Sequence, residues 1–415
     1  MNTNLRFWIG ASLAILMASN LTTVLKAQDT STASSPSVST STSGSSTAPA
    51  TPSSWLDNMP DSTLPVHFGL NLSETYDDNI FLQPSKTYDW ITAVSPSALF
   101  TMGDQESANE NYVNLFYQPT FLIYANNSNQ DNIEENVNAQ YSHTFTKLRL
   151  GIGQQYQKLS DATVDSNNIV NRDVYTTRAI ADYDYSDKLS IHGVATQTWT
   201  NYANGNQANT REWDLNSYFL YDLTPKLKLG VGPSIGFLDQ QYAPNQTYQQ
   251  LLGHLQYQAT GKITVSLAAG VEDRQYQYGR NDQVTPVFDL RGDYQATDST
   301  SFNLSGHAET YASASLQGQN YQDIAVQGGV SQRFLQKFYV NINAGYDNST
   351  YNTISSNATN TGRVDNYFFV KPGVSWVPNN WLNVSASYQY SKDNSNYNYA
   401  SFNDSQYSIS IQLKY

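Results

Sequence analysis

The chain has 415 residues and no cysteine, and its 22 Lys and Arg against 35 Asp and Glu give a formal net charge of −13. The lack of cysteine excludes disulfide frameworks, cysteine-based zinc sites and thiol catalysis, and the acidic balance argues against nucleic-acid binding, which needs clustered basic residues. Charged residues are only 14% and apolar residues 39% of the chain, yet it carries 31 Tyr, 16 Phe and 7 Trp. So many rings argue against a disordered chain, and a mean hydropathy of −0.52 argues against a helical membrane protein.

The first 65 residues are predicted to lie outside the folded domain. Residues 1–27 are typical of a cleaved secretory signal peptide, because Arg6 supplies a positive charge and Phe7–Met17 form an apolar core too short to span a bilayer. Residues 28–65 are predicted to be a disordered linker, rich in Ser and Thr, since such a segment buries too little apolar surface to offset the entropy of ordering it. The folded domain is therefore expected at residues 66–415.

Throughout residues 66–415, apolar and polar residues alternate. The last run shows the pattern most clearly: its apolar face carries Tyr407, Ile409, Ile411, Leu413 and Tyr415, and the residues between them are all polar. Alternation with period two predicts strands whose two faces meet different environments. Several runs reach the length of about nine to eleven residues that a tilted strand needs to cross a bilayer.

Short turns and longer connections alternate along the same region. Strands are predicted to open after Lys147, Lys188, Lys226, Lys262 and Lys337, at spacings of 41, 38 and 36 residues and then 75. Longer connections rich in Asn, Ser, Asp and Gly are predicted at residues 158–173, 203–211, 239–247, 352–363 and 392–403. Short turns at one end and long loops at the other are typical of transmembrane barrels.

The number of runs predicts closure into a barrel. About eighteen strands (16–20) fit between Val66 and Tyr415, and an open sheet of that size would leave two unpaired edges, which a bilayer does not tolerate. We therefore expect an all-β, transmembrane, antiparallel β-barrel. A soluble β-propeller also repeats near forty residues, but its blades need four short strands where each repeat here has two long ones.

The polar face of the strands is predicted to line water. It is too rich in amides, hydroxyls and charges to form a packed core, and charges along a pore wall tune its selectivity. The acidic excess suggests a mild preference for cations. The residues predicted to line the lumen and set its selectivity are Arg149, Arg178, Asp182, Asp184, Asp289, Arg291, Asp293 and Arg333. The alternative, that these charges only brace neighbouring strands, stays open.

The segment Leu72–Leu82, with the sequence LSETYDDNIFL, resembles the opening strand of a β-barrel porin family of bacterial outer membranes, whose members are often encoded near exosortase or exopolysaccharide systems. Residues 89–96 and 147–150 are also similar to that family. The terminal Ile411, Leu413 and Tyr415 are similar to the signal that outer-membrane proteins present to the barrel-assembly machinery, although Phe is commoner than Tyr at the last position. The resemblance implies an outer-membrane location, contact with outer-membrane lipids and a porin role; it names no solute and leaves homo-oligomers open.

Candidate chemistry is sparse. The sequence Gly232–Gly236 matches the G-x-S-x-G elbow of serine hydrolases, but that elbow joins a strand to a helix, whereas here it falls inside an alternating run. An outer-membrane hydrolase would combine Ser234 with His143, and no two of the five histidines have the spacing of a chelating pair. Acidic turns at residues 77–79, and Asp161 with Asp165, lack the ligand spacing of a dedicated calcium loop. We therefore predict no enzymatic activity, no metal and no cofactor.

Two functions fit these predictions. The first is passive diffusion of small hydrophilic solutes, filtered by size and charge without a chemical step. The second is a structural barrel with a lumen closed by its own loops, serving exopolysaccharide export or surface attachment. Inward folding of residues 158–173 or 352–363 would favour a constricted lumen, and conductance in planar bilayers separates the two functions.

Overall fold

The computed structural model of the chain describes residues 65–103, 110–277, 282–355, 358 and 361–415. The predicted signal peptide lies outside these residues, as does the predicted linker apart from residue 65. Across the described ranges the elements are β-strands and one short 3₁₀ helix, η1 (Ser128–Gln130), and no helix has the length and apolar character needed to cross a membrane.

The strands number eighteen, as the alternation predicts. In chain order they are β1 (Val66–Asp77), β2 (Asp89–Met102), β3 (Asn111–Tyr124), β4 (Asn132–Thr144), β5 (Leu148–Thr163), β6 (Asn168–Ser186), β7 (Leu189–Tyr202), β8 (Thr210–Thr224), β9 (Leu227–Gln240), β10 (Gln246–Thr260), β11 (Ile263–Tyr276), β12 (Gln283–Thr297), β13 (Thr300–Ala312), β14 (Gln319–Phe334), β15 (Phe338–Thr353), β16 (Val364–Asn379), β17 (Leu382–Ser395) and β18 (Phe402–Lys414).

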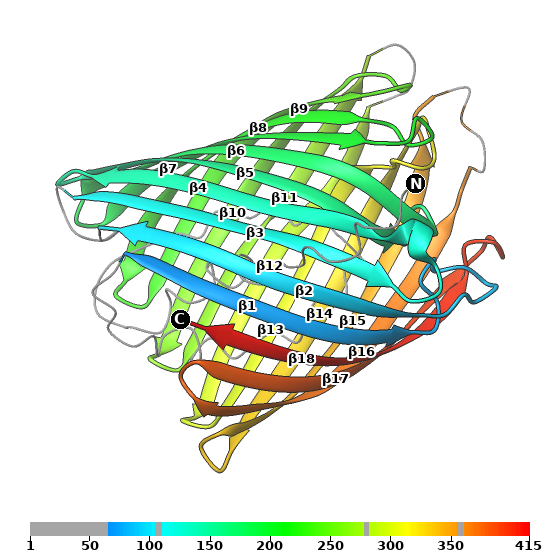
Figure 1. Cartoon of the computed structure of the whole chain (residues 1–415). Helices are drawn as coiled ribbons and strands as arrows, with labels where there is room; N and C mark the ends of the chain where they lie inside the picture. Colours follow the sequence, from blue (N-terminus) through cyan, green and yellow to red (C-terminus); the bar gives the residue numbers. More distant parts are fainter. Residues whose placement is uncertain (1–64, 104–109, 278–281, 356–357, 359–360) are drawn as a thin grey trace.

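The strands form a single closed antiparallel barrel, seen from the side in Figure 1. Each strand pairs with its neighbours in sequence, and β1 pairs with both β2 and β18. The seam is completed by two backbone hydrogen bonds of 2.8 Å between Phe68 and Tyr415, one in each direction. Among the described strands closure leaves no unpaired edge, so the predicted all-β antiparallel barrel is confirmed.

The two ends of the barrel differ, as predicted, but one long connection was placed wrongly. Residues 158–173 were expected to form a polar loop. Instead β5 continues to Thr163 and β6 begins at Asn168, so that a four-residue turn joins two unusually long strands of 16 and 19 residues. The ladder between them is unbroken from Leu148↔Tyr183 to Thr163↔Asn168. The polar composition therefore marks strands that extend beyond the apolar band of the barrel.

Two prolines interrupt one ladder at the same place. The pairing of β2 with β3 is missing between Val94↔Phe121 and Ala98↔Tyr117, and continuing the register across this gap sets Pro96 opposite Pro119. Proline has no backbone N–H to donate. Because the two missing donors face each other, the gap is confined to one short stretch and both strands continue beyond it.

Candidate functional site

The inner face of the barrel is polar and its outer face is apolar. On β18, Tyr407, Ile409 and Ile411 expose 54%, 61% and 40% of their surface, whereas the intervening Ser410 and the preceding Gln406 are buried. The same division holds around the ring, because successive side chains of a strand point to opposite faces. An apolar exterior around a polar interior is the arrangement of a membrane barrel with a hydrated lumen.

The tip of the β5–β6 hairpin reaches across one end of this lumen. The carboxylate of Asp165 accepts hydrogen bonds from the Ser313 hydroxyl at 2.7 Å and from the backbone N–H groups of Ala314 and Ser315 at 3.0 and 3.1 Å. These residues connect β13 to β14, and β14 lies nine strands from β5 in a ring of eighteen. The tip therefore bonds to the diametrically opposite side of the barrel.

The tip also contacts two further connections. The Asn167 side-chain amide donates to the backbone carbonyls of Leu82 and Ala400, at 3.0 Å each. Leu82 lies between β1 and β2, and Ala400 lies between β17 and β18. From the β7–β8 connection, the N–H of Ala208 donates to the Ala314 carbonyl at 2.8 Å. Several connections thus meet over the same mouth of the barrel.

Arg363 fastens the tip from the β15–β16 connection. Its guanidinium donates to the carbonyls of Val164 at 2.8 Å and Asp165 at 3.1 Å, pairs with Asp365 at 2.6 Å and lies 4.9 Å from the centre of the Tyr351 ring. Only 1% of the side chain is exposed. Burial by itself would lower the pKa of Arg363, but Tyr351 and Asp365 outweigh it and raise that pKa above its usual range. The guanidinium is a permanent charge that holds the backbone of the tip and, at 3.4 Å, the side-chain oxygen of Asn167.

An apolar cluster seats the tip as well. Val164 packs with Leu82, Tyr367 and Phe402 in a buried group, with Ala162 and Phe369 packed against it. These residues come from β5, β16, β18, the β1–β2 connection and the β5–β6 turn. Burying Val164 in this cluster excludes water from the base of the tip, so the tip is a fixed constriction rather than a loop lying on the surface.

Acidic side chains are concentrated on one part of the wall. The part formed by β5 and β6 carries Arg149, Arg172 and Arg178 together with Asp161, Asp182 and Asp184, so its charges balance. The part from β14 round to β1 is acidic, and we call it the acidic wall. It consists of Asp323 on β14, Asp347 on β15, Asp393 on β17, Asp404 on β18 and Asp77 on β1. Charges along the wall of a lumen tune its selectivity for passing solutes.

The eight residues predicted to line the lumen all occupy inward positions, but they do not act as one group. The Nε of Arg149 donates to Asp182 at 2.9 Å, and His192 Nδ1 contacts the other carboxylate oxygen of Asp182 at 2.8 Å. On β12, Arg291 lies 3.5 Å from Asp289, and Asp293 follows two residues later on the same face.

The other two predicted lumen residues lie at the short-turn mouth. Asp184 is exposed, and Arg333 donates to the Asp298 carbonyl in the β12–β13 turn at 3.0 Å. The terminal residues Ile411 and Tyr415 are exposed, and Leu413 shares their outward face. Their role as an assembly signal remains a prediction.

The G-x-S-x-G motif belongs to the wall. Gly232, Ser234 and Gly236 all face inward on β9, and the Ser234 hydroxyl donates to Asp214 at 3.0 Å. A Cβ atom at Gly236 would lie 1.9 Å from Cζ of Tyr248, so glycine is needed for that ring to lie flat against β9. His143 contacts Asn111 at 2.9 Å on the outer side of β4. Ser234 and His143 are therefore on opposite faces and cannot form a catalytic pair.

The acidic turns considered for calcium are arranged differently from each other. Asp161 forms an ion pair with Arg172 at 2.7 Å, whereas Asp165 accepts a hydrogen bond from the Ser313 hydroxyl. Asp77 and Asp78 lie with Asp404, and their carboxylate oxygens are within 4.8 Å of one another. Lys86 binds one Asp78 oxygen at 2.7 Å. The turn at residues 77–79 is thus partly buried, and Asp404, far away in the chain, completes the acidic group.

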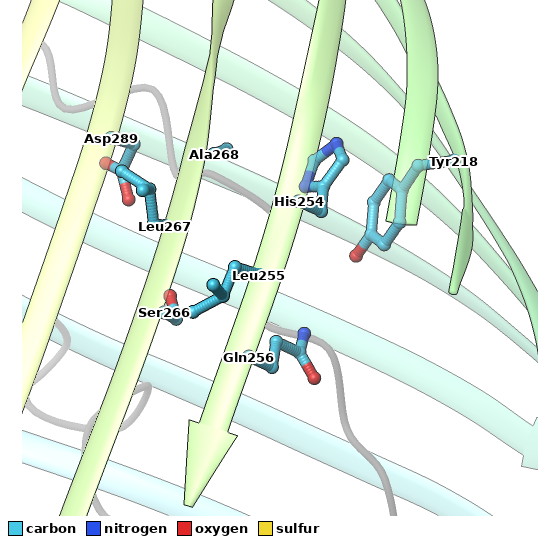
Figure 2. A pocket seen from close by; sticks show the side chains of 8 residues that line it. All are labelled: Tyr218, His254, Leu255, Gln256, Ser266, Leu267, Ala268 and Asp289. Atoms are coloured by element: carbon cyan, nitrogen blue, oxygen red, sulfur yellow. The ribbon is translucent and has the colours of Figure 1, made fainter. Parts of the chain in front are cut away.

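A shallow hollow in the wall lies between β8 and β12. Tyr218, His254, Gln256, Ser266 and Asp289 are among the residues that line it. The Tyr218 and His254 rings stack with their centres 4.3 Å apart. Tyr218 lies directly against Gly232 of β9, where a side chain would clash with it. Figure 2 shows the two rings side by side and Asp289 across β11 from them. The hollow offers a solute an aromatic face together with hydrogen-bond donors and acceptors.

Asn167, Tyr351 and Arg363 are parts of the constriction that were not predicted from the sequence.

No protein-family model and no curated protein matches this chain. Among solved structures, it is similar to the outer membrane protein opdK from Pseudomonas aeruginosa, with 13% identity and a TM-score of 0.46 over 84% of this chain and 99% of that one. It is also similar to Acinetobacter baumannii OccAB4, with 12% identity and a TM-score of 0.44 over 86% of this chain and 100% of that one. At such identities these are likenesses of shape.

Proposed function

We propose that the protein is an outer-membrane channel through which small hydrophilic solutes diffuse passively. One observation carries the proposal: a closed ring of eighteen strands presents exposed apolar side chains outward and polar side chains inward. Lipid suits the first surface and water suits the second. In such barrels the short turns face the periplasm and the longer connections face outward, and residues 1–27 would direct export.

Selection by size rests on the β5–β6 tip. Asp165, Asn167 and Arg363 hold the tip over the lumen, so a solute must pass beside it. Selection by charge rests on the acidic wall, because arginines and aspartates balance each other on β5 and β6. Since inward carboxylates outnumber inward basic groups, cations are favoured. No chemical step is required, and we propose that the protein is not an enzyme.

A second candidate is a barrel with a closed lumen that serves exopolysaccharide export or surface attachment. The observation in its favour is how firmly the tip is seated: Val164 is buried among Leu82, Tyr367 and Phe402, while Asp165 bonds to the opposite connection. A gate held by so many contacts opens only when a partner or a substrate replaces some of them.

Liposome swelling tests the proposed function. Vesicles containing the purified, refolded barrel should swell in isotonic solutions of small sugars, and the rate should fall steeply as the sugar grows from a pentose to a trisaccharide. Swelling no faster than that of protein-free vesicles for every solute would contradict the channel and favour the closed barrel.

A further inference from the structure

One arrangement of residues is repeated five times at the short-turn end of the barrel. In each, a lysine ends the turn and the next residue opens a strand. The partner of that residue on the following strand is an aromatic residue whose ring points outward. The pairs after Lys147, Lys188, Lys226, Lys262 and Lys337 are Leu148↔Tyr183, Leu189↔Tyr221, Leu227↔Tyr257, Ile263↔Tyr294 and Phe338↔Trp376. We call each lysine with its aromatic partner a lysine–ring unit.

The backbone fixes the geometry of every unit. In all five, the carbonyl of the lysine accepts a hydrogen bond of 2.8 Å from the N–H of the residue directly after the ring. Those donors are Asp184, Asp222, Gln258, Gln295 and Val377. The lysine is therefore placed against the strand that carries the ring, and the spacing between the two is the same around the rim.

In three units the position of the ammonium is also defined. Lys226 donates to the carbonyl of Ala259 at 3.0 Å, Lys262 to that of Ala296 at 3.5 Å and Lys337 to that of Pro378 at 2.7 Å. Each acceptor lies two residues after its ring, so the ammonium is held at the rim next to the ring. An ammonium has three N–H donors. One is used by the carbonyl, and two remain for a ligand.

Both parts of the unit are open to their surroundings. The five lysines are exposed, and the five rings expose between 39% and 47% of their surface. On a membrane barrel, outward tyrosine and tryptophan at a strand end lie at the level of the lipid headgroups. A cation fixed beside such a ring meets the phosphate of a headgroup rather than acyl chains or bulk water.

We propose that the lysine–ring units bind the headgroups of anionic phospholipids. The ammonium donates two hydrogen bonds to the phosphodiester oxygens, and the ring packs beside the glycerol and ester groups. A basic residue near the surface favours anionic over zwitterionic lipid by about fivefold. The inference requires the membrane location proposed above, but it does not require that the lumen conduct.

The experiment measures lipid selectivity at the barrel surface. The refolded protein is placed in phosphatidylcholine vesicles containing a trace of spin-labelled phosphatidylglycerol or spin-labelled phosphatidylcholine, and electron paramagnetic resonance gives the ratio of their association constants. We expect a preference for phosphatidylglycerol of about fivefold in the wild type at low salt, falling toward one in 1 M salt because the charges are then screened.

Variants identify the residues responsible. Replacing all five turn lysines by glutamine should remove the preference, and replacing them by arginine should keep it. The matched control changes lysines toward the other end, Lys86→Gln, Lys158→Gln and Lys392→Gln, and should leave the preference unchanged. If the variant with all five lysines replaced by glutamine does not fold, the double variant Lys226→Gln and Lys262→Gln should still lower the ratio of the two association constants.

Two results would overturn the inference: a wild type without preference, or glutamine variants with the full preference. Conductance distinguishes this outcome from failure of the proposed function. A barrel that conducts without lipid preference contradicts the lysine–ring units alone, whereas one that shows the preference without conducting contradicts the channel alone.

Discussion

The carboxylate of Asp165 accepts a hydrogen bond of 3.1 Å from the hydroxyl of Tyr351, which projects from β15, nine strands away from β6 in the ring of eighteen. Asp165 is in a turn between two long strands, and Tyr351 is buried on the opposite wall. The bond therefore spans the mouth of the barrel. It makes the width of the lumen at that end a property of the β5–β6 hairpin.

Removing the Asp165 carboxylate should widen the channel. In Asp165→Ala, the tip loses its hydrogen bonds to the Ser313 and Tyr351 hydroxyls and to two backbone N–H groups, and bonds to charged groups contribute about 1.5–3 kcal/mol each. We expect a higher single-channel conductance. The matched control is Asp173→Ala, on the same hairpin but bonded to Tyr156. An unchanged conductance in Asp165→Ala would show that the tip does not limit flow.

Replacing Arg363 should destabilise the mouth of the barrel. Arg363→Met leaves the buried carboxylate of Asp365 without its partner, and breaking a buried ion pair in this way costs about 3–5 kcal/mol. We expect a lower midpoint of urea unfolding in detergent micelles. Arg211→Met removes an exposed guanidinium that lies 5.3 Å from the Trp199 ring and should have a small effect. Equal midpoints for the two variants would contradict the role assigned to Arg363.

A methyl group at Gly236 should not fit. In Gly236→Ala the new Cβ would lie 1.9 Å from Cζ of Tyr248, so the ring must move and its hydrogen bond of 2.8 Å to Glu212 is strained or lost. Overpacking of this kind costs about 1–3 kcal/mol. Gly253→Ala, on β10, is the control, because its nearest neighbour is the Ala269 carbonyl oxygen at 3.7 Å. Unfolding by urea compares the two, and similar stabilities would refute the packing argument.

Neutralising inward carboxylates should reduce cation preference. Asp289→Asn with Asp293→Asn removes two negative charges from the lumen and leaves Arg291 between them. In a potassium chloride gradient, the reversal potential should move toward zero or toward the value for anions. Asp273→Asn removes one charge from an outward position on β11 and should not change the potential. A reversal potential that stays at the wild-type value in the double variant would mean that these residues do not face the ion path.

The barrel was predictable from the sequence because its cause is local. Each strand alternates with period two. Ile409 and Ile411 therefore identify its apolar face, and Ser408 and Ser410 its polar face, before any partner strand is known. Closure then follows from the cost of unpaired edges in a bilayer. The one misplaced connection, at residues 158–173, has no apolar alternation, because those parts of β5 and β6 extend beyond the lipid.

The constriction could not be predicted, because its contacts join residues far apart in the chain. Arg363 and Val164 are 199 positions apart, and nothing in either segment identifies the other. The partner of Asp182 also depends on strand pairing, because Arg149 is directly opposite Asp182 on β5.

The most direct test of the account is the current through single barrels in a planar bilayer. Purified, refolded wild-type protein should give discrete steps of uniform size, and Asp165→Ala should give larger ones, because ions pass through a water-filled lumen beside the β5–β6 tip. A wild type that inserts as a folded barrel but gives no steps, with Asp165→Ala equally silent, would contradict it.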